Sequence, residues 1–100
     1  MNIVETSRGM LTDDLKKTWK AVMGEELTVR KLRLLPFVDY SIKNGNTIPA
    51  VNLEPAEMEI LEQWHEDGHI LYDGEKVYVT MPFYTAMQTV LFYGYTSYLE

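Results

Sequence analysis

Two histidines four residues apart offer the clearest possibility of chemistry in this sequence. His65 and His69 flank Glu66 in the string His-Glu-Asp-Gly-His, which has the H-E-x-x-H spacing. On one continuous helix, residues four apart share a face, so two imidazoles could bind Zn²⁺ while the glutamate activates a metal-bound water. The spacing gives one hypothesis for function, a minimal zinc hydrolase with His65 and His69 as metal ligands.

The same five residues also carry evidence against a metal site. They resemble the motif of the zincin metalloproteases, which lies within a helix, whereas Asp67-Gly68 is typical of a helix end. On a strand, His69 would lose its one-turn relation to His65, and the chain has no third histidine. Because a zinc site needs three protein ligands and the sequence offers two, we expect neither a metal nor another cofactor.

Other catalytic patterns are missing from the sequence. It has no cysteine and no G-x-S-x-G motif, and its six glycines are isolated at predicted turns and helix ends. A catalytic thiol, a nucleophile elbow and a glycine-rich phosphate loop are therefore absent. The lack of cysteine also excludes disulfides and fits a reducing compartment. We expect a protein that is not an enzyme.

Size and charge set broad limits on the function. The 100 residues are typical of one domain, 1–100, in which residues 1–10 form a lead-in. The net charge is −6, but residues 1–50 carry +2 and residues 51–100 carry −8. This polarity disfavours non-specific binding of nucleic acid. The N-terminus has no basic region followed by an apolar run, so we expect no signal peptide and a cytoplasmic location.

The negative charge is concentrated in one predicted helix. Pro55 suits a first helical position and Asp67-Gly68 suits an end, which places an acidic helix at about 54–67. An apolar stripe of Ala56, Ile60, Leu61 and Trp64 should face the core. The outward positions are carboxylates, which predict a protein partner with a basic surface: Glu57, Glu59, Glu62 and Glu66.

The C-terminal segment is uncharged and rich in aromatic residues. Residues 77–99 contain no Lys, Arg, Asp, Glu or His, and Pro82 begins a helix predicted at about 82–93. The stripe of Phe83, Met87, Val90 and Leu91 is typical of core. Polar residues and Pro82 argue against a membrane span. The aromatic excess predicts a partner-binding surface and a homodimer: Tyr84, Phe92, Tyr93, Tyr95 and Tyr98.

Two helices are predicted in the N-terminal half. Thr12 and Thr28 suit N-caps, and Gly24 suits the end of the first helix. After Pro36 two interpretations remain open. Residues 37–43 and 47–53 form a hairpin about Asn44-Gly45, which we favour slightly, or a kinked helix continues to Asn44-Gly45.

A second hairpin at 69–80 is predicted from Asp73-Gly74, with Ile70 opposite Val77 and His69 opposite Tyr78. A helix followed at once by a hairpin resembles the recognition helix and wing of a winged-helix domain. That resemblance implies a nucleic-acid-binding regulator, although six acidic residues on the helix would repel phosphates. Nucleic acid would then contact basic residues of the first two helices: Lys16, Lys17, Lys20, Arg30, Lys31 and Arg33.

The fold class predicted is α+β: two N-terminal helices, a small antiparallel sheet including the 69–80 hairpin, the acidic helix and the C-terminal aromatic helix. The function we favour is a small acidic, non-enzymatic binding or regulatory protein that acts through protein contacts. Its size and charge are similar to those of phage-encoded modulators of host machinery. The winged-helix-like regulator and the zinc hydrolase are the alternatives.

Overall fold

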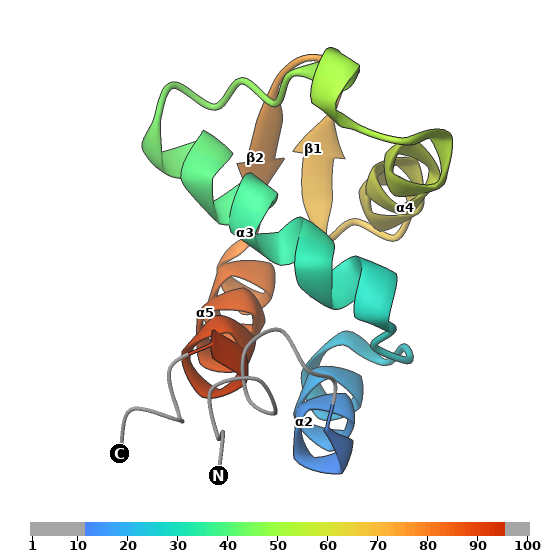
Figure 1. Ribbon diagram of the computed structural model, residues 1–100, viewed down its shortest axis with the longest axis vertical. Helices are drawn as coiled ribbons and strands as arrows, with labels where there is room; N and C mark the ends of the chain where they lie inside the picture. The colour runs from blue at the N-terminus through green and yellow to red at the C-terminus, as the bar shows by residue number, and fades with distance from the viewer. Residues whose placement is uncertain (1–11, 96–100) are drawn as a thin grey trace, which may run out of the picture.

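The computed structural model describes the backbone of residues 12–95 and the side chains of residues 12–93. The described chain is α+β, as predicted, and helix α3 crosses its middle (Figure 1). The hairpin and α4 lie on one side of α3, and α2 packs with α5 on the other. The elements are α2 (Asp13–Met23), α3 (Val29–Lys43), the 3-10 turn η1 (Ala50–Asn52), α4 (Pro55–Glu66), β1 (Ile70–Tyr72), β2 (Val77–Val79) and α5 (Met81–Tyr95).

The ends of the first two helices are set by local side-chain chemistry. The Thr12 hydroxyl accepts from the Leu15 N–H, and the Thr28 hydroxyl accepts from the Lys31 N–H, both at 3.2 Å. Each bond satisfies one of the N–H groups that a helix start leaves without a partner. Gly24 ends α2 in the left-handed conformation at φ 71°, and its N–H donates to the Lys20 carbonyl. The predicted caps are confirmed.

The hairpin predicted for residues 37–43 and 47–53 is not formed, because α3 continues through Pro36 to Lys43. The buried positions Leu34, Leu35, Val38 and Ser41 follow a helical period, whereas Tyr40, which alternation would place beside them, is exposed. Pro36 removes one backbone donor without ending the helix. The predicted return strand is also wrong. Only Thr47 forms an antiparallel bridge, to Lys76, before the chain turns through η1.

The second hairpin is present, but its predicted register is wrong. Ile70 pairs with Val79, Leu71 with Tyr78 and Tyr72 with Val77. The turn is centred on Gly74-Glu75, because the Asp73 carboxylate accepts from the Glu75 and Lys76 N–H groups at 2.9 and 2.7 Å. The observed pairing differs from the predicted pairing by two residues. Because side chains alternate between the two faces of a strand, this shift does not change which residues share a face, and Ile70, Tyr72 and Val77 are buried.

The core is organised around two tryptophans and a phenylalanine from three helices. Trp19 of α2, Trp64 of α4 and Phe83 of α5 are completely buried. Their ring centroids are 5.0 to 6.0 Å apart in tilted and edge-to-face pairs. Val22 and Val29 lie three residues from the buried Trp19 and Leu32, at helical spacing, yet they are about half exposed. Among the described helices, none is both long and apolar enough to cross a membrane.

Substitution of Gly24 tests whether the left-handed backbone at the end of α2 requires glycine. A Cβ at Gly24 would meet no atom within 4 Å, so Gly24→Ala costs only the left-handed conformation at φ 71°. We expect a loss of about 1–2 kcal/mol in the free energy of unfolding, measured with urea. Gly24→Asn should lose less, because asparagine tolerates this region better. Equal losses for the two variants would contradict this explanation.

Candidate functional site

The two histidines of the H-E-x-x-H string do not share a helix. Helix α4 ends at Glu66, and the chain turns at Asp67-Gly68 before His69. His65 Nδ1 accepts the Tyr72 N–H at 3.2 Å, which fixes that ring against β1. The one-turn geometry required by the zinc hydrolase hypothesis, with His65 and His69 as paired ligands, is therefore absent from this structure.

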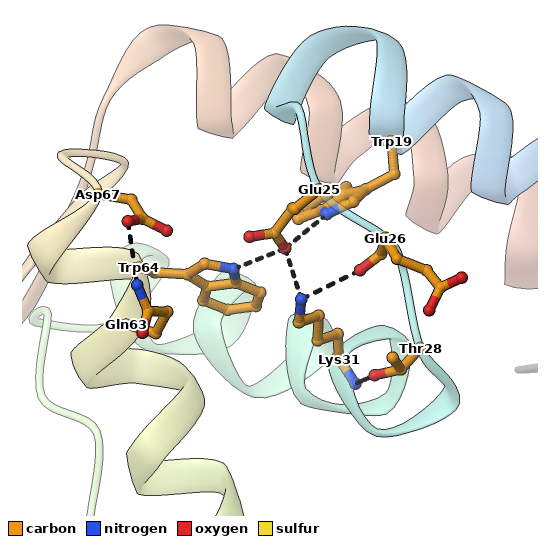
Figure 2. Close-up of polar contacts among 8 residues, drawn as sticks. All are labelled: Trp19, Glu25, Glu26, Thr28, Lys31, Gln63, Trp64 and Asp67. Carbon is orange, nitrogen blue, oxygen red and sulfur yellow. Dashed lines mark hydrogen bonds and ion pairs between the residues drawn. The ribbon is translucent and has the colours of Figure 1, made fainter.

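A carboxylate from the loop after α2 occupies a position that the sequence did not indicate. Glu25 Oε2 accepts from the Trp19 indole N–H at 2.9 Å and from the Trp64 indole N–H at 3.0 Å. The Lys31 ammonium lies 3.0 Å from the same oxygen. Figure 2 shows the three donors converging on Glu25 from α2, α4 and α3. One oxygen therefore connects three helices at the edge of the aromatic core.

The surroundings of Glu25 favour its ionised form. Burial alone raises the pKa of this carboxyl, because its side chain is only 18% exposed. Hydrogen bonds from Trp19, Trp64 and Lys31, together with the Lys31 charge, outweigh burial and hold the pKa below the usual 4.5. The group is thus a fixed carboxylate at neutral pH rather than a proton donor.

Three of the four carboxylates predicted on the outward side of α4 are exposed, whereas Glu57 accepts the Glu54 N–H at the start of the helix, at 2.8 Å. Glu59, Glu62 and Glu66 are exposed and Glu57 is half-buried, while Leu61 and Trp64 are fully buried. In the described part of the chain, these four carboxylates form no ion pair, and Glu54 alone on this segment pairs with Arg30, at 2.8 Å. The outward side of α4 is therefore a strip of carboxylates that form no ion pair with a described residue.

An apolar pair lies beside that acidic strip, on the outer face of the hairpin. Leu71 and Tyr78 are directly paired and are 63% and 49% exposed. A shallow groove of about 250 Å³ between them and His65 of α4 also reaches Asp73. Burial and the charges of Glu62 and Asp73 raise the pKa of Tyr72 at this place. The predicted register did not pair these two residues, because it placed Tyr78 opposite His69.

The aromatic helix is partly core and partly surface. Phe83, Met87 and Val90 are buried, Tyr84 is half-buried, and Phe92 and Tyr93 are exposed. Tyr95 and Tyr98 lie outside the residues whose side chains are described. An open groove of about 610 Å³ runs between α5 and α3. Its lining includes Pro36, Asp39, Tyr40, Gln88, Leu91 and Phe92.

The basic residues proposed for nucleic acid are not a single free set. Lys31 is bound to Glu25, and Arg30 is bound to Glu54. The other four are exposed and form no ion pair with a described residue: Lys16, Lys17, Lys20 and Arg33. Two of six cations are thus already neutralised within the fold.

Comparison with known proteins adds no family to these observations. No family model matches the chain, and no curated protein or solved structure matches it either.

The low pKa of Glu25 predicts acid-sensitive stability. A carboxyl whose pKa is depressed by folding stabilises the protein above its unfolded value of about 4.5 and loses that effect as the pH falls. We expect the stability advantage of wild type over Glu25→Gln to hold from pH 7 to about 5 and to shrink below the unfolded pKa. Urea unfolding at several pH values measures this.

Two further variants test whether Lys31 contributes to the low pKa of Glu25. Lys31→Met removes one charge that lowers the Glu25 pKa, so the folded pKa moves toward the unfolded value and this variant should lose less stability than wild type as the pH falls below about 4.5. Glu26→Gln, at an exposed neighbouring position, should keep the wild-type profile. A wild-type profile in Lys31→Met would remove Lys31 from the explanation.

Proposed function

We propose that this chain is a non-enzymatic binding protein whose acidic face docks on a basic surface of a protein partner. The acidic face is defined by Glu59, Glu62 and Glu66 of α4 together with Leu71 and Tyr78 of the hairpin. The observation that supports this most is that the three carboxylates are exposed and form no ion pair with a described residue. Their charge is therefore available to a partner.

The two parts of the acidic face would contribute differently. Exposed charges act over about one Debye length, roughly 8 Å at physiological salt, and mainly accelerate and orient encounter. The apolar Leu71–Tyr78 pair would supply contact area once the surfaces meet. A suitable partner segment therefore combines Lys or Arg with at least one apolar side chain. Such a mode resembles that of small acidic modulators that occupy basic sites meant for nucleic acid.

Charge reversal tests the acidic face. We expect Glu59→Lys/Glu62→Lys to slow association with a Lys/Arg-rich amphipathic peptide by at least about tenfold at low salt, because both carboxylates lie on the encounter surface. Stopped-flow fluorescence anisotropy of the labelled peptide measures the rate. Wild-type binding should weaken as salt rises.

The matched control reverses one charge outside the acidic face. Glu26→Lys changes the net charge as much as Glu59→Lys alone does, but at an exposed position outside α4. Equal effects of these two single variants would show a net-charge effect and reject the acidic face. Tight, salt-sensitive binding of duplex DNA, lost in Lys16→Ala/Lys17→Ala/Lys20→Ala, would favour the nucleic-acid regulator.

The groove between α3 and α5 supports a second element of the proposal, self-association. Tyr40 of α3 and Phe92 of α5 are 68% and 53% exposed along it. We expect a concentration-dependent dimer in sedimentation at micromolar concentration, weakened by Tyr40→Glu and by Phe92→Glu. Leu71→Glu changes a residue of the hairpin that does not line this groove, so it should leave the dimer intact. A wild-type monomer at all concentrations would reject this element.

A further inference from the structure

We propose that Glu25, Asp67 and His69 form a binding site for a divalent transition metal ion. Each residue offers one ligand atom, and these atoms lie within 4.8 Å of one another. The group joins the loop after α2 to the turn after α4, two places separated by some forty residues of sequence. It is a different site from the His65–His69 pair of the sequence motif.

The free oxygen of Glu25 is directed at this site. The hydrogen bonds from Trp19 and Trp64 and the ion pair with Lys31 all end on Oε2. Figure 2 shows the second oxygen on the side of Asp67. The carboxylate is thus held at one oxygen and open at the other, which is a favourable arrangement for a metal ligand because its orientation is already fixed.

The other two ligands are also held in place. Asp67 Oδ1 accepts from the Gln63 side-chain amide at 3.0 Å. The backbone of His69 is anchored on both sides, since its N–H donates to the Trp64 carbonyl and its carbonyl accepts from Thr80. Zn²⁺ bonds of about 2.0–2.2 Å space tetrahedral ligands at roughly 3.3–3.6 Å, so the three ligand atoms, now within 4.8 Å of one another, must move closer together around an ion.

The donor set and the local field define the ion. One imidazole with two carboxylates suits Zn²⁺, Co²⁺ and related ions better than Mg²⁺ or Ca²⁺, which prefer oxygen alone. The site lies at the C-terminal end of α4, where the helix dipole attracts a cation. Lys31 balances part of the Glu25 charge, and the Asp67 carboxylate restores a net negative site. Three protein ligands leave one position for water.

The structure contains its own reporter for this site. The chain has two tryptophans, and both donate to the Glu25 carboxylate. An ion on Glu25 should therefore change the intrinsic fluorescence. We expect metal-free protein to bind one Zn²⁺ by calorimetry, with a fluorescence change that saturates at the same ratio, and Co²⁺ to give visible absorption bands of a nitrogen–oxygen site.

Variants separate this site from the sequence motif. His69→Ala and Asp67→Asn should each weaken Zn²⁺ binding by at least about tenfold and remove the fluorescence change. His65→Ala is the matched control and should bind like wild type, with folding of all variants checked by circular dichroism. Failure of the wild-type protein to bind would overturn the proposal, as would an equal loss in His65→Ala. Neither result bears on the acidic face.

Discussion

The structure depends on one oxygen atom, Glu25 Oε2, that satisfies two indole donors. Trp19 and Trp64 are completely buried, and a buried N–H without an acceptor costs about 1–3 kcal/mol. A single carboxylate accepts from both at 2.9 and 3.0 Å, so the large rings can meet in the core while their polar edges stay bonded. The loop between α2 and α3 is thereby fixed to α4, and Lys31 completes the arrangement from α3.

Local chemistry explains which parts of the fold the sequence could predict. The caps at Thr12, Thr28 and Gly24 depend on residues within three or four positions, and all three are confirmed. Residues 37–43 carry both a strand-like and a helical pattern, and the packing of Leu34, Leu35 and Val38 on the rest of the core decides between them. The hairpin register is set by the Asp73 side chain, which outweighs the Asp-Gly turn preference.

The candidate site could be predicted only in part. The outward carboxylates of α4 follow from helical periodicity, because the same stripe that buries Trp64 leaves Glu59 and Glu62 outside. Glu25 gives no periodic signal, since it lies in a loop and bonds to a residue 39 positions away. Periodicity identifies Trp19 and Trp64 as core, but it does not state that their N–H edges meet. That information exists only after the helices have packed.

The carboxylates of the acidic face lower the stability of α4, and the fold does not require them. Glu59 and Glu62, and Glu62 and Glu66, are three and four residues apart, so their like charges destabilise α4 by about 0.2–0.5 kcal/mol per pair. Glu62 and Glu66 also lie toward the negative end of the helix dipole, which adds to the penalty. Burial of Leu61 and Trp64 more than offsets it, at about 1.5–3 kcal/mol for a leucine side chain alone. Neutral polar residues at the same positions would make a more stable helix, so the folding of α4 does not explain these carboxylates.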